Sequence, residues 1–200
     1  LALPTGYIRD MRALAASLGS IVVTGVDYCV DANRKTVSNR GLVLVPKGWP
    51  ERKSASLVDE YWFGKTYPAP EEEEGIRKRS SGRYTFRPDP IVWLFHADCF
   101  GRIGLCICYD FMDLERALMY RARVHHFLVI AYNQDLQSFH SLAESFSRSV
   151  YSNVAICNTG HYGGSVAISP YYRPHMRTVY RHEGSQLFTV QTFSLPVSSL

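Results

Sequence analysis

The chain has 200 residues, of which 46% are hydrophobic and 20% charged, and its formal net charge is +4 at pH 7. Such a composition is ordinary for a folded domain with a substantial apolar core, and the charge is too small to indicate a nucleic-acid partner. No apolar run approaches the roughly 18–20 residues that a membrane-spanning helix needs, so we expect no membrane partner.

The cysteines are odd in number and lie mostly inside apolar runs, at Cys29, Cys99, Cys106, Cys108 and Cys157. This pattern is typical of reduced thiols in the cytoplasm and not of a disulfide framework. The sequence begins at Leu1 without a methionine. We therefore expect residues 1–200 to be one domain that forms part of a longer polypeptide.

The first half of the chain begins with apolar residues repeated at helical spacing over 7–18, and Gly19 suits the end of that helix. Buried strands are predicted over 21–26, 41–46 and 57–63. The stretch 66–90 holds several prolines and the acidic run Glu71–Glu74, and it is predicted to be a long irregular loop, of the kind that often acts as a lid.

The second half alternates strands and helices. Strands are predicted over 91–97 and 102–108, and a helix follows with Asp113 as its cap. A strand over 126–131 then leads into an amphipathic helix over 136–150, and four short strands are predicted beyond it, at 154–157, 166–169, 178–181 and 186–192. The expected class is α/β, with sheets covered by helices.

The most informative segment, R-I-G-L-C-I-C-Y-D at 102–110, predicts a buried strand that turns sharply into a helix. Cys108 lies at that corner, where free amides and the positive end of a helix dipole would favour a thiolate. Cys106 falls deeper on the same strand and is assigned to the core. A cysteine in an apolar strand is more often structural than reactive, so the corner alone leaves both interpretations open.

A metal site is the weaker alternative for these cysteines. The sequence contains no C-x-x-C pair, and the C-x-C of Cys106 and Cys108 has no second pair to complete a tetrahedron. We therefore expect no metal.

Four sequence blocks follow one another in an order that resembles the nitrilase superfamily of carbon–nitrogen hydrolases. They are I-C-Y-D at 107–110 with L-E-R at 114–116, V-A-I-C-N-T-G at 154–160, G-G-S-V-A-I-S-P at 163–170 and H-E-G-S-Q-L-F-T-V at 182–190. The resemblance implies a four-layer α-β-β-α sandwich, whose first strand would be missing here. It also implies hydrolysis of a non-peptide carbon–nitrogen bond in a small amide, carbamoyl compound or nitrile, without a cofactor, by a homo-oligomer.

The resemblance also implies site residues. Cys108 matches the nucleophile and Lys65, at the end of the predicted strand 57–63, matches the catalytic lysine. Glu73 is chosen by spacing as the helper glutamate. The backbone N–H of Tyr109 is the implied oxyanion donor, and Asn133 the implied substrate-binding residue.

One departure leaves a second function open. The general-base glutamate of the family precedes the segment that matches this chain, so it is absent from these 200 residues. The alternative is a catalytically incomplete nitrilase-like domain that serves as an assembly or regulatory module of a larger multidomain protein.

Overall fold

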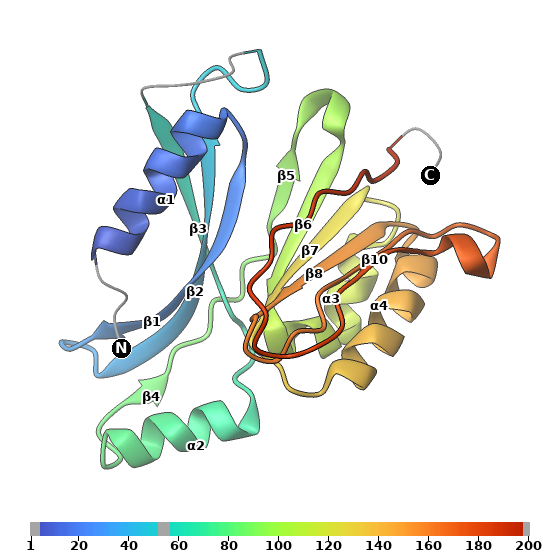
Figure 1. The fold of residues 1–200 in the computed structure, drawn as a ribbon. Coiled ribbons are helices and arrows are strands. Elements are labelled where there is room, and N and C mark those ends of the chain that lie inside the picture. Colours follow the sequence, from blue (N-terminus) through green and yellow to red (C-terminus); the bar gives the residue numbers. More distant parts are fainter. Residues whose placement is uncertain (1–4, 52–56, 198–200) are drawn as a thin grey trace. The chain divides into compact units, whose positions relative to one another are not determined.

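The computed structural model describes residues 5–51 and 57–197, which form two compact units divided between Ile91 and Val92. Each unit combines a β-sheet with helices that pack on it (Figure 1). This arrangement confirms the predicted α/β class.

The first unit contains, in chain order, α1 (Thr5–Leu18), β1 (Val22–Asp31), β2 (Thr36–Pro46), β3 (Val58–Gly64), α2 (Pro70–Arg79) and β4 (Thr85–Phe86). The strands β1, β2 and β3 are antiparallel neighbours, and β4 pairs with β2 in parallel. Helix α1 lies along this sheet (Figure 1), where Ala15 packs with Val26, Leu42 and Leu44 in a buried core. The helical period of 7–18 arises from this one-sided burial.

The β1–β2 hairpin is longer than the predicted strands 21–26 and 41–46. Its register continues through Asp27↔Arg40 to Asp31↔Thr36. The turn is stabilised by the Asp31 carboxylate, which accepts the N–H groups of Asn33 and Arg34 at 3.1 and 3.0 Å. In this extension the short apolar run Tyr28–Val30 lies between two aspartates, and it faces the mostly polar residues 36–40. A run this short does not by itself predict a strand.

The predicted irregular loop 66–90 is wrong, because it contains α2 and β4. Pro70 occupies the first turn of α2, where its missing N–H is not needed. Acidic residues follow in that turn and basic residues close the helix, at Arg77, Lys78 and Arg79, so the charges complement the helix dipole. Ile76 is the only apolar side chain that this helix buries, which is why α2 lacks an amphipathic signature.

The second unit contains β5 (Leu94–His96), a 3₁₀ helix η1 (Asp98–Phe100), β6 (Arg102–Ile107), a 3₁₀ helix η2 (Cys108–Met112), α3 (Leu114–Tyr120), β7 (His126–Ala131), α4 (Leu136–Val150), β8 (Asn153–Asn158), β9 (Val166–Ile168), a 3₁₀ helix η3 (Pro174–Met176) and β10 (Thr178–Arg181). The sheet order is β10-β9-β8-β7-β6-β5, with β6, β7 and β8 parallel. Helices α3 and α4 lie on one face of the central strands (Figure 1). Beneath them Phe111, Phe127, Phe139 and Phe146 form an aromatic core.

The helix predicted over 136–150 is confirmed as α4, and Asp135 caps it by accepting the N–H of Ser138 at 3.1 Å. The strand predicted over 186–192 is wrong, since that segment is irregular. Its alternating pattern suits a strand, but a strand requires a neighbour to pair with.

None of the helices in the described ranges is long and apolar enough to cross a membrane.

Candidate active site

Cys108 lies where β6 ends and the chain turns into η2. Its backbone has a φ of 48°, which is a left-handed conformation. Residues other than glycine rarely adopt this backbone conformation, and holding such a residue in it typically costs about 1–3 kcal/mol. Strain of this kind persists where the surrounding structure enforces it, and it concentrates at functional sites.

The thiol of Cys108 is partly buried, and its Sγ lies 3.9 Å from the carbonyl oxygen of Tyr132, which follows β7. Cys106 is 1% exposed and belongs to the aromatic core, as predicted from its place on the strand. The thiol of Cys108 is therefore accessible in part, whereas that of Cys106, two residues earlier, is buried.

A buried ion pair supports the turn that carries Cys108. The carboxylate of Asp110 in η2 is fully buried, and its Oδ2 lies 3.5 Å from a terminal nitrogen of Arg116 in α3. Asp113 caps α3 by accepting the N–H of Glu115 at 3.0 Å, which confirms its predicted role. The helix next to Cys108 is, however, the short η2, and the α-helix begins only at Leu114. The dipole available to the thiol is consequently smaller than the sequence suggested.

Asn158, at the end of β8, connects the loops that follow β7 and β8, and the sequence analysis missed it. Its side-chain NH₂ donates to the carbonyls of Asn133 (2.8 Å) and Gly163 (2.7 Å), and its Oδ1 accepts the N–H of Asn133 (2.9 Å). The side chain of Asn133 in turn closes a tight turn with Asp135. The backbone and the side-chain amide of Asn133 thus have partners within the protein. Its predicted contact with a substrate stays a prediction.

Aromatic side chains surround the loop beside Cys108. The ring of Tyr132 meets that of Tyr162 edge to face at 5.1 Å, and Tyr162 contacts the ring of His161 at 4.7 Å. His161 is held from its other side by Gln186, whose amide lies 2.7 Å from Nδ1. These rings offer an apolar, polarisable wall at the carboxyl end of β7.

In the first unit, Lys65 lies directly after β3 and forms an ion pair with Glu72 of α2. Both side chains are buried, with 3% and 7% of their surfaces exposed. Glu72 also accepts the amide of Asn39 at 2.9 Å and the N–H of Ala69 at 3.0 Å. The predicted helper Glu73 is exposed, and the ion pair of Lys65 is made with Glu72, so the structure brings Glu72 to Lys65.

This correction has a simple geometric origin. In an irregular loop, sequence spacing does not tell which of two neighbouring glutamates faces Lys65. In a helix, adjacent side chains point about 100° apart, so only one of them can face it. A usable signal was present in A-P-E-E, because a glutamate two residues after a proline at the helix start can reach back to the preceding N–H.

The charge state of Glu72 follows from its surroundings. Burial by itself would raise its pKa, but hydrogen bonds from Lys65 and Asn39, the charge of Lys65 and the N–H of Ala69 outweigh burial and lower the pKa below the ordinary value. Glu72 is therefore a carboxylate at neutral pH, and it holds Lys65 in place as a buried ammonium.

The second unit supplies a thiol on a strained corner, followed by Tyr109 in η2. A thiol of this kind suits covalent catalysis, in which a thiolate attacks a carbon. The first unit, by itself, supplies a buried ammonium fixed by a carboxylate. Residues 5–51 and 57–197 hold no cluster of three or more His, Cys, Asp or Glu side chains that could bind a metal ion.

Limited alkylation should distinguish the thiols. We expect iodoacetamide at neutral pH to label Cys108 before Cys106 and Cys157. Cys106 is buried in the core, and desolvation raises the pKa of the Cys157 thiol although that residue is exposed at the surface. Peptide mapping by mass spectrometry at short reaction times measures the order. Labelling of Cys106 ahead of Cys108 would show that the corner does not present its thiol.

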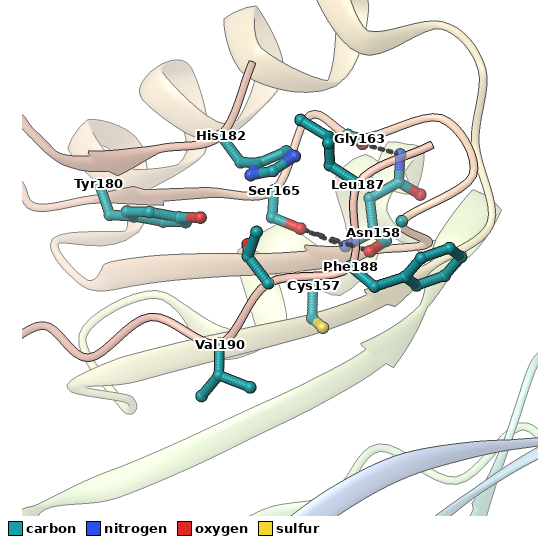
Figure 2. A pocket seen from close by; sticks show the side chains of 11 residues that line it. Cys157, Asn158, Gly163, Ser165, Tyr180, His182, Leu187, Phe188 and Val190 are labelled. Carbon is teal, nitrogen blue, oxygen red and sulfur yellow. Dashed lines mark hydrogen bonds between the residues drawn. The ribbon is translucent and has the colours of Figure 1, made fainter. Parts of the chain in front are cut away.

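A cavity of about 280 Å³ lies elsewhere in the second unit, and Cys108 does not line it. Figure 2 shows Ser165, Tyr180 and His182 on one side of it, with Leu187, Phe188 and Val190 on the segment that crosses it. Asn158 contributes to its wall while bonding to Ser165 and Gly163.

No family model and no curated protein matches the sequence. Solved structures do match the fold. A CN-hydrolase superfamily protein of Xanthomonas campestris, solved with an arsenic adduct in its active site, is 15% identical with a TM-score of 0.65, over 96% of this chain and 69% of that one. An amidase of Nesterenkonia sp. is 14% identical with a TM-score of 0.60, over 86% of this chain and 60% of that one. A mutant of the Nesterenkonia amidase in complex with butyramide has the same identity and TM-score, with 61% of its length covered.

The chain thus spans between 60% and 69% of the length of these structures. Sequence identities of 14–15% with TM-scores of 0.60 and above show a shared fold and not a shared activity. The fold implied by the sequence blocks around Cys108 is therefore confirmed, and the chain has the fold of the nitrilase, or carbon–nitrogen hydrolase, superfamily.

Proposed function

We propose that this chain is the nucleophile-bearing part of a carbon–nitrogen hydrolase acting on a small amide, carbamoyl compound or nitrile. The observation that carries the proposal is the left-handed backbone of Cys108 at the end of β6, within a fold shared with amidases. A strained residue with a reactive side chain at a strand end is a recurrent arrangement for a nucleophile.

For an amide, Sγ of Cys108 forms a bond to the carbonyl carbon, and the proton that the thiol gives up passes to the leaving nitrogen. The carbon–nitrogen bond breaks, and ammonia or an amine leaves. Water then attacks the thioester, the carbon–sulfur bond breaks, a proton of the water returns to Sγ, and the acid is released. The N–H of Tyr109 and the ammonium of Lys65 stabilise the oxyanion. Glu72 takes the helper role that spacing had assigned to Glu73, because it is Glu72 that fixes Lys65. Asn133 positions the substrate from the end of β7.

The similar structures support an amide substrate. The Nesterenkonia amidase was solved as a mutant in complex with butyramide, and another of its mutants carries acrylamide added to the active-site cysteine. A small uncharged amide of this kind is the first candidate for the present protein. The reaction needs no organic cofactor and no metal, since thiol, ammonium and water supply every group that moves.

The proposed enzyme is a homo-oligomer of the cytoplasm. Leu114, Leu118 and Met119 are large apolar side chains exposed on α3, and an apolar helix face of this kind commonly lies against a partner. A second copy of the chain is the proposed occupant. The free thiols favour a reducing compartment.

Trapping the thioester tests the proposed reaction. The protein that contains this chain is incubated with butyramide, an aromatic amide or an aliphatic nitrile, quenched in acid, and mapped by mass spectrometry. We expect an acyl adduct on the peptide that contains Cys108, and none on that of the exposed Cys99. Without any adduct or turnover across the panel, the alternative of an assembly or regulatory module would replace the enzymatic proposal.

A further inference from the structure

The carboxyl-terminal segment, residues 191–197, runs along the sheet of the second unit (Figure 1). The ring of Phe193 stacks on that of Tyr180 of β10, with 5.4 Å between the ring centres. The carbonyl oxygen of Pro196 accepts the side-chain amide of Asn153 of β8 at 2.6 Å. Residues 191–194 are exposed, so the segment has little buried surface to compensate for the loss of either contact.

The contact at Pro196 belongs to a buried polar network. Asn153 is fully buried, and its Oδ1 accepts the hydroxyl of Ser169 at 2.7 Å. Its Nδ2 lies 3.1 Å from Nδ1 of His126, at the start of β7. The other ring nitrogen of His126, Nε2, lies 3.0 Å from the carbonyl oxygen of Phe100 in η1. Each polar atom of the Asn153 side chain therefore has a partner.

These partners fix the protonation state of His126. A carbonyl can only accept, so the atom of Asn153 that faces Pro196 is its NH₂ group. That group directs its second hydrogen toward Nδ1 of His126, which must therefore be an acceptor. The carbonyl of Phe100 in turn requires a hydrogen on Nε2. The network thus holds His126 as the neutral Nε2–H tautomer.

A proton on Nδ1 is incompatible with this arrangement. The new N–H would face the NH₂ of Asn153, and two buried donors cannot satisfy each other. Turning the amide over would present Oδ1 to the imidazolium, and Ser169 would adapt because a hydroxyl can both donate and accept. The same turn would place an oxygen against the carbonyl oxygen of Pro196, so that contact would be lost.

We propose that His126 is a pH latch for residues 191–197. While its ring is neutral, it holds the segment on the sheet through Asn153, and when the ring takes up a proton from solvent, the segment is released. No covalent bond changes. Neither Asn153 nor residues 191–197 can ionise, so a pH effect at this contact begins at the ring.

The surroundings of His126 keep the latch closed at neutral pH. Burial lowers its pKa and outweighs the hydrogen bond to Phe100, which raises it, while His125 on the same strand lowers it further. Because folding lowers this pKa, the contact contributes stability above the unfolded value of about 6.5. The contribution is lost as the pH falls through the folded value. The other ionisable side chains on the elements that contact the ring are Arg102 and Cys106 on β6, Cys157 on β8, and Asp98 and Cys99 in η1.

Chymotrypsin cleavage after Phe193 measures the release, because a protease acts on the population in which the segment has left the surface. The initial rate in the protein that contains this chain is divided by the rate for a free peptide with the sequence of residues 190–197. This ratio corrects for the pH dependence of the protease. We expect it to rise about tenfold between about pH 8 and about pH 5.

Two variants locate the effect. His126→Asn keeps a side-chain oxygen for the amide of Asn153 and takes up no proton in this range, so its cleavage ratio should stay constant. His96→Gln removes an exposed histidine from β5 of the same sheet, and it should respond to pH as the unchanged protein does.

NMR of the ring nitrogens supplies a readout that needs no variant. We expect the Nε2–H tautomer of His126 at neutral pH, and a titration whose midpoint coincides with that of the cleavage ratio. A ratio that does not change with pH, a rise that persists in His126→Asn, or a hydrogen on Nδ1 at neutral pH would each overturn the latch. Loss of the circular dichroism signal over the same range would also overturn it, because it would show overall unfolding. None of these results depends on whether the protein hydrolyses an amide.

Discussion

Replacement of Cys108 by Ala should abolish turnover of the amide or nitrile substrate in the protein that contains this chain, with kcat falling by about 10⁴-fold or more. Without Sγ no thioester can form, and the remaining groups can only polarise the substrate. Steady-state kinetics of the purified variant measure the loss. Its free energy of unfolding should change little, because Ala retains the Cβ and the same left-handed φ at this position.

The matched control is Cys99→Ala, which removes an exposed thiol from η1 of the same unit. It should leave kcat and KM unchanged. Turnover that survives in Cys108→Ala, but is lost in another cysteine variant, would move the nucleophile away from the β6 corner and contradict the proposed mechanism.

Replacement of Lys65 by Met is expected to destabilise the protein strongly, besides removing the proposed oxyanion contact. Glu72 would keep its burial and lose its counter-charge. Breaking a buried ion pair from one side typically costs about 3–5 kcal/mol. Urea unfolding followed by circular dichroism measures this free energy. The double variant Lys65→Met with Glu72→Gln should regain much of the loss, because it leaves no unpaired buried charge.

Glu73→Gln is the control, since this neighbouring carboxylate is exposed and should change the stability by less than about 0.5 kcal/mol. The pH dependence gives a second check. Because the pKa of Glu72 is lowered by folding, its contribution to stability is present above the unfolded value of about 4.3. This contribution is lost as the pH falls through the folded value. A larger effect of Glu73→Gln than of Glu72→Gln would contradict the pairing seen at Lys65.

The sequence was informative wherever the relevant interactions are local. Helix α4 could be predicted to its end residues, because a helical period is a local feature. The same holds for the corner at Cys108, where an apolar strand meets a run of turn and cap residues. The strand predicted over 186–192 is wrong because strand formation depends on a distant element. An alternating pattern shows which side chains a strand would bury, but the strand also needs a neighbouring strand with which to pair.

The sequence by itself therefore determined the α/β class, the helix α4 and the position of Cys108 at the end of β6. Only the tertiary structure decided which glutamate reaches Lys65, because that choice depends on the rotation of α2 and on Asn39, 33 residues earlier on β2. It also revealed Asn158, whose three side-chain hydrogen bonds join Asn133, 25 residues earlier, to Gly163, five residues later. Contacts of this kind are set by the packing of distant elements, and no local pattern of residues encodes them.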